Sequence, residues 1–376
     1  MTRLPELKFS ADERIQIKKY VKQIEANIAK EEMTPLERLL TAERHKEPDR
    51  VPIHLCTMEH NSRAIKVPLR EIYKDPKKAV LADLATVALY GSDVMHNYPD
   101  PHVIGTEEMG TKIDYPEDST AILREFPVKT IDDVDRLEVP DPYADGKLPK
   151  VLQIIETESE LLGDKMVIWQ HLNGPFGHAG DIRGYMNLLR DMVVDPDFIH
   201  ALMKFTTKAT ITITKAVQKA GAIAWPFDAL VAAEYLGRKR YVDFVYPYHK
   251  KAMEALTPPG AYLGIDGKVH DMIEEYAATG ARGICIEDVR SMDDLADFKR
   301  RVGDKTTFLS IINWTDTLLT GSKEEIEKKT REEIKILAPG GGYILGAGVV
   351  PLDGDPARVK IFMDAAKRYG KYPIRL

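Results

Sequence analysis

Short apolar segments that alternate with helical segments are the feature of this chain that most restricts its fold. Eight such segments follow one another, and most are separated by stretches in which apolar residues recur with helical spacing. Parallel strands need long crossover connections, which helices usually supply. The pattern therefore predicts an α/β protein, a (β/α)8 TIM barrel, with a doubly wound open sheet as the alternative. The predicted strands are 51–55, 93–97, 166–172, 223–228, 262–266, 283–288, 306–312 and 343–348.

Two parts of the chain depart from this repeat. Residues 1–33 are charged and helix-prone, so we expect an N-terminal helical extension that packs on the body or on a partner. A capping sequence, Thr34-Pro-Leu-Glu37, begins the predicted barrel domain, residues 34–376. Residues 99–145 are rich in Pro, Asp and Glu and follow the second strand, so we expect this insertion to lie over the barrel mouth.

Composition excludes several classes of protein. With 376 residues, 44% hydrophobic and 30% charged, the chain is typical of a folded soluble protein with one large core. Its net charge of −6 argues against a nucleic-acid or anionic-membrane surface. No stretch approaches the ~20 apolar residues of a membrane span, and the start lacks a signal-peptide core. Cys56 and Cys285 lie in apolar runs, which indicates buried thiols and a cytoplasmic protein.

Two segments carry a family resemblance. The first, WQHLNGPFGHAGDIRGY at residues 169–185, joins a buried strand to a Gly-Pro break and an amphipathic helix. The second, APGGGYILGAG at residues 338–348, is a helix end, a glycine turn and a short apolar strand. Both resemble blocks of the uroporphyrinogen decarboxylase superfamily, which also contains the methylcobamide-dependent methyltransferases. Shorter matches lie at 195–200, 246–250 and 280–283, and the resemblance covers roughly residues 34–370.

Two departures from the superfamily pattern narrow the activity that the resemblance implies. Its decarboxylases grip the acidic groups of a porphyrinogen with two arginines after the first strand, but here Glu59 replaces the first of them and would repel such a substrate. Its thiol-methylating branch, typified by the coenzyme M methyltransferases, holds zinc with a His-x-Cys-Gly motif and a later cysteine. The aligned positions here are Gly264, Asp266 and Val349. We therefore expect neither activity by those mechanisms.

The branch that remains transfers a methyl group from a small-molecule donor to a corrinoid protein. O-demethylases of methoxylated aromatic compounds resemble this layout. The segment 266–270 lacks the spacing of the Asp-x-His-x-x-Gly cobalamin signature, so the corrinoid is expected on a separate partner protein. Two alternatives stay open: methyl transfer from the corrinoid to tetrahydrofolate, a related pterin or a thiol such as coenzyme M, and a non-catalytic small-molecule-binding barrel. A homodimer is also compatible with the chain.

The candidate site residues are the His and acidic residues that gather at the predicted strand ends, where TIM barrels carry their sites. We predict that the catalytic residues are Asp228, Asp266, His171 and Glu59. The predicted substrate-binding residues are Asn173, Trp225, His96, Asn313 and Glu287. A departing phenolate, whose parent acid has a pKa of roughly 10 by analogy with Tyr, needs a general acid or a Lewis-acid metal.

Asp266, Asp228 and His171 are expected to converge at the barrel mouth, within about 15 Å of one another. There they could hold zinc through oxygen and nitrogen atoms, or one carboxyl group could donate the proton directly. Each candidate also has a structural interpretation. Asp228 and Glu287 could cap helices, Asp266 could belong to a turn, His171 could be a hydrogen-bonded core residue, and Glu59 could lie in a solvated loop.

Overall fold

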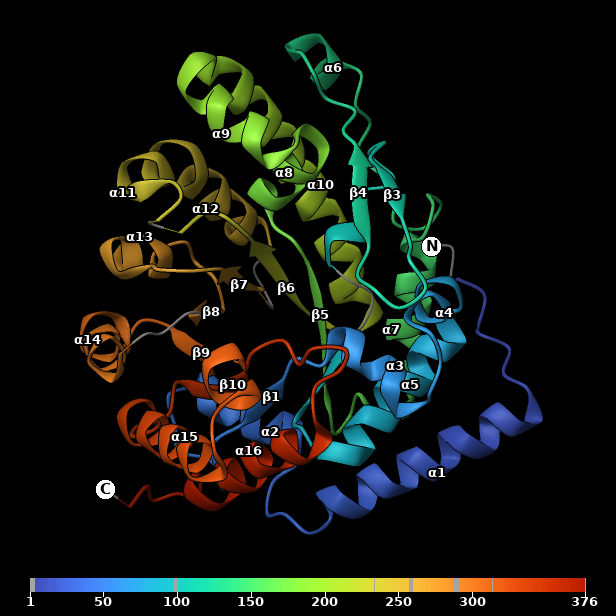
Figure 1. The fold of residues 1–376 in the computed structure, drawn as a ribbon, viewed down its shortest axis with the longest axis vertical. Helices are drawn as coiled ribbons and strands as arrows, with labels where there is room; N and C mark the ends of the chain where they lie inside the picture. Colours follow the sequence, from blue (N-terminus) through green and yellow to red (C-terminus); the bar gives the residue numbers. More distant parts are fainter. Residues whose placement is uncertain are drawn as a thin grey trace.

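The strands form the predicted barrel. A computed structural model describes residues 4–97, 101–232, 234–256, 260–286, 291–312 and 314–375, and eight parallel strands make one sheet. Asp93 N–H donates to the Ile53 carbonyl at 3.0 Å, so the two end strands meet and nearly close the barrel (Figure 1). The order around the sheet is β1 (Ile53–Leu55), β10 (Tyr343–Ala347), β9 (Thr307–Ile312), β8 (Gly283–Ile286), β7 (Tyr262–Ile265), β6 (Ile223–Asp228), β5 (Val167–Asn173) and β2 (Val94–Asn97).

Helices surround the strands, and several begin at the capping residues that the sequence offers. Thr34 forms the expected capping box with Glu37, and Asp195 accepts a backbone N–H at the start of the longest helix. The helices are α1 (Ala11–Ile28), α2 (Pro35–Glu43), α3 (Asn61–Ala64), α4 (Leu69–Lys74), α5 (Pro76–Tyr90), α6 (Ile131–Asp135), α7 (Leu148–Leu162), α8 (Pro175–Arg183), α9 (Tyr185–Val194), α10 (Pro196–Ala220), α11 (Gly237–Arg240), α12 (Tyr246–Ala255), α13 (Ile273–Ala277), α14 (Met292–Val302), α15 (Lys323–Leu337) and α16 (Pro356–Tyr369).

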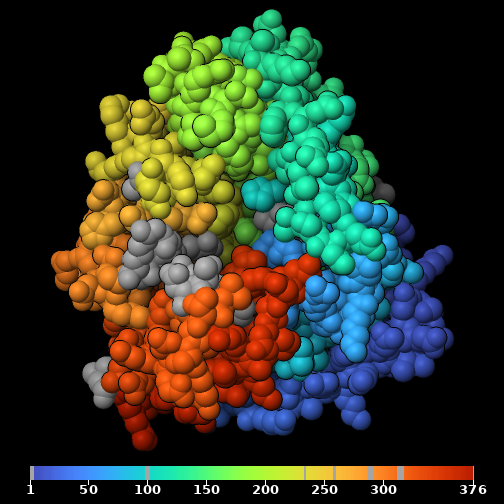
Figure 2. Space-filling view, viewed as in Figure 1, coloured from blue at the N-terminus to red at the C-terminus, as the bar shows by residue number. Residues whose placement is uncertain are grey.

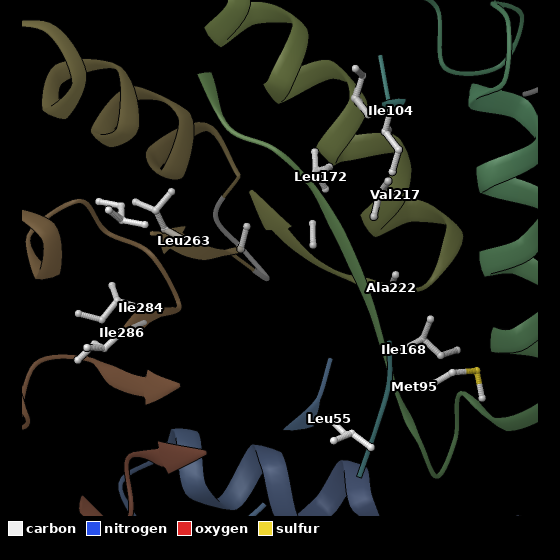
Figure 3. Close-up of a cluster of buried hydrophobic side chains, with 14 of the residues drawn as sticks. Leu55, Met95, Ile104, Ile168, Leu172, Val217, Ala222, Leu263, Ile284 and Ile286 are labelled. Atoms are coloured by element: carbon white, nitrogen blue, oxygen red, sulfur yellow. The ribbon is translucent and has the colours of Figure 1, made fainter. Parts of the chain in front are cut away.

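Two cores follow from the alternation of side chains along each strand. The outer core lies between strands and helices, where Leu172 of β5 and Leu263 of β7 are two of its strand residues and Val217 of α10 is one of its helix residues (Figure 3). The inner core fills the barrel and includes Trp169, Trp225, Tyr262, Cys285, Leu309 and Ile344. Both cysteines are buried thiols, as expected.

A glycine makes room for the aromatic rings of the inner core. A Cβ atom at Gly264 would lie 2.2 Å from Cδ2 of Phe227 and 2.6 Å from Nε1 of Trp225. Both contacts are shorter than van der Waals contact allows, so these two rings occupy the space that a side chain at 264 would need. Gly264 therefore admits these two bulky rings.

The insertion after β2 lies at the C-terminal ends of the strands, as expected. It contains an antiparallel hairpin, β3 (Lys112–Asp114) and β4 (Ile122–Glu125), and the short helix α6. Hydrogen bonds attach it to α8: Val128 N–H donates to the Ile182 carbonyl at 3.1 Å, and the Thr111 hydroxyl donates to the Asp181 carbonyl at 2.8 Å. Figure 2 shows a hollow near the centre of this face, bordered by the insertion and by the segment that follows β10.

The N-terminal segment packs on the body of the protein. Ile17 and Ile24 of α1 are buried, and the Gln23 side chain donates to the Ala88 carbonyl of α5 at 3.0 Å. Lys165 also forms an ion pair with Glu25 at 2.7 Å. Among the described residues, no helix is long and apolar enough to cross a membrane.

A buried ionic cluster lies at the end of the barrel where the strands begin, opposite the barrel mouth. Arg38 and Arg50 donate to Asp93 at 2.5 and 2.6 Å, and Arg38 also contacts Asp49 and Glu31. Burial alone would raise the pKa of Asp93, but the charges of Arg50 and Arg38 outweigh it and lower that pKa below its ordinary value. This end therefore carries stabilising charges, as is usual for the face opposite a TIM-barrel site.

Candidate active site

An aromatic cluster fills the upper part of the barrel interior. We use this name for Trp169, His171, Trp225, Phe227, His54 and His96. The His171 ring stacks on Trp225 with centroids 4.5 Å apart, and its edge-on contact with Phe227 is 4.9 Å. In the parallel register His171 lies opposite Trp225, which places the two rings side by side on adjacent strands.

His171 is a buried imidazole whose nitrogens are available to a ligand. It is 5% exposed, and among the described residues neither ring nitrogen has a hydrogen-bond partner. Burial lowers its pKa well below the ordinary value, and the neighbouring His96, His102 and His54 lower it further. The ring is therefore neutral near pH 7 and offers one N–H donor and one acceptor.

Further donors in the cluster share this property. The indole N–H groups of Trp225 and Trp169 and the Nδ1 atom of His54 have no partner among the described residues. A buried donor that stays unsatisfied costs about 1–3 kcal/mol, so several in one place indicate a site for a ligand or for ordered water. The alternative interpretation of His171, as a hydrogen-bonded core residue, requires partners for its ring nitrogens. The described residues provide none.

His96 lies beside His171 but is held by its own contacts. Its Nδ1 atom is 3.0 Å from Nε2 of His54, and its Nε2 atom is 3.7 Å from the sulfur of Cys56. Burial lowers the pKa of His96 to about 3, so it too is neutral. Its ring meets that of His171 edge-on at 5.9 Å. The structure thus brings together His171, Trp225 and His96 of the predicted residues.

The Asp228 carboxylate is held by groups outside this cluster, and the expected approach of His171, Asp228 and Asp266 to within about 15 Å stays a prediction. Its carboxylate accepts the N–H groups of Phe176 at 3.2 Å and Gly177 at 2.5 Å, and it lies 2.5 Å from Nε2 of His249. These partners belong to α8 and α12, so Asp228 faces the helices. Helix capping was the alternative interpretation, although the capped helix is α8 and not the helix that follows β6.

Asn173, at the end of β5, also makes structural contacts. Its amide donates to Asp181 of α8 at 2.6 Å and lies 3.4 Å from the hydroxyl of Thr106 in the insertion. Asp181 in turn lies 2.9 Å from Nδ1 of His102. Asn173 therefore joins three segments at the rim of the barrel mouth, and its predicted role in substrate binding stays a prediction.

The other predicted residues lie around the same rim. Glu59 belongs to the 3-10 turn Met58–His60 and is 6% exposed, so the solvated-loop interpretation is wrong. Asp266 is half-buried and directly follows β7. Glu287 and Asn313 lie outside the described residues.

The predicted zinc site is not formed by the described residues. Among them, no group of three or more His, Cys, Asp or Glu side chains could hold a metal ion. The turn of Asp228 toward α8 and α12 removes one of the three proposed ligands from the barrel interior.

Sequence reasoning missed two buried pairs near the site. His249 contacts Asp228, which lies 21 residues earlier in the sequence. Burial and the nearby charge of Asp83 on α5, 75 residues earlier, raise the pKa of Glu158 on α7. His249 lies inside a segment that matches the superfamily, but nothing in the sequence indicates its partner. Glu158 lies in the amphipathic helix α7, where acidic residues usually face water, and Asp83 lies in α5, which is buried on nearly every side.

Comparison with known proteins bears on the family and the fold of this chain. The family model for uroporphyrinogen decarboxylase (URO-D) matches residues 34–369. The uroporphyrinogen decarboxylase of Anaeromyxobacter dehalogenans is 26% identical over 358 residues, covering 89% of this chain and 99% of the relative. The methylcobamide:CoM methyltransferase MtbA of Methanosarcina mazei is 24% identical over 352 residues, covering 90% and 99%. A solved methyltransferase from Methanosarcina mazei shares the fold, with a TM-score of 0.81 and 21% identity over 90% of this chain and 99% of that one.

Proposed function

This chain belongs to the uroporphyrinogen decarboxylase family, and on that premise we propose that it is a corrinoid-dependent methyltransferase. In this proposal a small methylated molecule, a methoxylated aromatic compound, gives its methyl group to a corrinoid on a separate protein. Similarity to MtbA, a methylcobamide:CoM methyltransferase, supports the class of reaction. The direction of transfer and the aromatic donor are our inference from the site.

The region after β1 argues against a porphyrinogen substrate. Glu59 is buried there, where a decarboxylase of the superfamily would carry an arginine. Arg63, at the second arginine position, donates to the Leu352 carbonyl at 3.2 Å. A buried carboxylate and an arginine already bound to backbone do not form a clamp for several carboxylates.

The open donors of the aromatic cluster are the observation that carries the proposal. The rings of His171, Trp225 and Phe227 provide flat apolar surfaces against which an aromatic ring can pack. The His171 imidazole and the Trp225 indole offer N–H groups, and ether oxygens accept hydrogen bonds but do not donate them. An aryl methyl ether therefore matches both the shape and the hydrogen-bonding character of this surface.

The chain's own residues then act on the leaving group. A reduced corrinoid supplies the nucleophile that takes the methyl group, and the aryl oxygen keeps the electron pair of the broken C–O bond. N–H groups of His171 and Trp225 stabilise the negative charge that develops on this oxygen. We assign proton donation to Asp266, which directly follows β7. The insertion over the mouth limits the access of water to the site.

Zinc, which would serve as a Lewis acid on the ether oxygen, does not fit the described residues. Asp228 is engaged by α8 and His249, and the described residues contain no three-ligand group. We therefore derive no step through a metal ion.

The test combines the purified protein with a reduced corrinoid protein and a panel of methoxybenzoates and methoxyphenols. We expect release of the free phenol only when both proteins are present. His171→Phe keeps a stacking ring but removes the N–H donor, and it should lower kcat by about 100-fold, as loss of one oxyanion donor does elsewhere. His270→Phe is the matched control, because His270 is exposed.

Three outcomes would contradict the proposal. Full demethylation by this chain alone would refute the division of labour between two proteins. Methyl transfer from a methylated corrinoid to tetrahydrofolate or coenzyme M, with no reaction on any methoxyarene, would favour the reverse direction. A protein that binds methoxyarenes without turnover would favour a binding barrel.

A further inference from the structure

Two buried carboxyl groups lie on α5 and α7, two helices that pack against each other. Asp83 of α5 is 1% exposed and Glu158 of α7 is 0% exposed, and the two lie near enough for the charge of Asp83 to act on the pKa of Glu158. Each also accepts an amide N–H from an asparagine: Asn61 donates to Asp83, and Asn97 donates to Glu158. We call Asp83 and Glu158 the carboxyl pair.

A hydrogen bond between the carboxyl groups of Asp83 and Glu158 requires a proton on one of them. Ionised carboxylates only accept hydrogen bonds, so two of them can bond to each other only when one retains its hydrogen. Burial, and then the charge of Asp83 and its hydrogen bond, raise the pKa of Glu158 well above its ordinary value. Glu158 is therefore the member that holds the proton, and the pair titrates as a unit.

The two asparagines connect the pair to the candidate site. Asn61 begins α3, directly after the turn that contains Glu59 and His60. Asn97 ends β2, directly after His96 of the aromatic cluster. One buried pair thus fixes both the loop after β1 and the end of β2, the two segments that supply Glu59 and His96 to the rim of the barrel.

Neighbouring titratable groups stay in one state near neutral pH or lie on the surface. His60 lies 2.7 Å from the Tyr90 hydroxyl, and burial lowers the pKa of His60 and raises that of Tyr90 to about 12. His96, on β2, is neutral because burial lowers its pKa to about 3. On the solvent side of α5, Lys77 and Lys78 form surface ion pairs with Glu13 and Glu71.

We propose that Asp83 and Glu158 share one proton and act as a positioning pair that holds the loop after β1 and the end of β2 in place for ligand binding. Loss of this proton at alkaline pH places two negative charges in contact. Because these charges repel, α5 and α7 can no longer hold both carboxyl groups in place. The side-chain amides of Asn61 and Asn97 then lose their hydrogen-bond acceptors. The inference depends on the proposed function only for its activity readout.

The first test detects the proton directly by infrared spectroscopy of the protein alone. Above the ordinary titration range of a glutamate, the wild type should show the carbonyl stretch of a protonated carboxylic acid, and Glu158→Gln should lose the part of this band that Glu158 contributes. Glu160→Gln is the matched control, because Glu160 lies on the same helix and is exposed. No band in the wild type, or a band that survives in both Glu158→Gln and Asp83→Asn, would overturn the shared proton, whatever the enzyme's activity.

The second test asks whether the proton positions the site. Methyl transfer by the wild type should fall about tenfold per pH unit above the alkaline midpoint, as for loss of a single proton. Glu158→Gln replaces the proton with an amide N–H that can still donate to Asp83, so it should remain active and lose this alkaline fall. The same alkaline fall in Glu158→Gln as in wild type and Glu160→Gln would refute the positioning role, while the infrared result would stand independently.

Discussion

Glu333 provides a quantitative test of how burial controls stability. It lies on α15 and is 3% exposed, and its carboxyl group is in contact with the hydroxyl groups of Tyr343, at 2.9 Å, and Ser310. Burial raises its pKa from 4.5 to about 7, although the Tyr343 hydrogen bond and the charge of Lys329 act in the opposite direction. The folded protein therefore keeps a proton on Glu333 between about pH 4.5 and pH 7, whereas the unfolded chain loses it.

The sign of the effect follows from this difference in proton binding. The pKa of Glu333 is higher in the folded protein than in the unfolded chain. Its contribution to stability is therefore fully present below about pH 4.5 and is lost as pH rises to about 7. At about 1.4 kcal/mol per pH unit, the interval from 4.5 to about 7 corresponds to about 3 kcal/mol. Glu333→Gln cannot ionise and does not lose this contribution. The difference in free energy of unfolding, variant minus wild type, should therefore increase by about this amount between pH 4.5 and pH 8.

Urea unfolding measured at several pH values would check this prediction. Glu332→Gln is the matched control, since Glu332 is adjacent, partly exposed, and forms only a long ion pair with Lys328 at 3.9 Å. Its difference from wild type should change little with pH, because surface pairs contribute about 0–1 kcal/mol. A Glu333→Gln difference that stays constant across this range, or that falls as pH rises, would show that the buried carboxyl group does not retain its proton.

Two further predictions concern residues around the aromatic cluster. Gly264→Ala should destabilise the protein by about 1–3 kcal/mol in thermal or urea unfolding, because the added methyl group meets Phe227 and Trp225; unchanged stability would mean that these rings can move aside. Asp228→Asn should lower stability by about 1–3 kcal/mol, since it weakens the α8 cap and the contact with His249. The variant should nevertheless keep most of its methyl-transfer activity per folded molecule. Complete loss of activity in well-folded protein would instead support the predicted catalytic role of Asp228.

The sequence was sufficient to predict the barrel because its signal is local. Each strand is a short apolar run, and each predicted run overlaps an observed strand. The position of His171 opposite Trp225 follows from the order of two adjacent strands and their register. The Thr34 capping box was also predictable, because its two residues are three positions apart.

The orientation of Asp228 could have been predicted from the sequence by the alternation of side chains. Trp225 and Asp228 are three residues apart on β6, so they point to opposite faces and cannot both line the barrel interior. The partners of Asp228 and Glu158 could not be predicted, because they depend on how separate helices pack on the sheet. The burial of Glu59 likewise results from the turn after β1, which no periodic pattern marks.

The charge state of the aromatic cluster favours a substrate that places an uncharged ether group there. Burial keeps His54, His96 and His171 neutral, and the remaining donors of the cluster are indole N–H groups. A polycarboxylate would enter without cations to offset its desolvation, which costs several kcal/mol per ion. A neutral ether has no such penalty, and negative charge appears on its oxygen only as the C–O bond breaks. Fixed N–H dipoles in a poorly hydrated site then stabilise the transition state more than the ground state. This difference in stabilisation is the condition for catalysis.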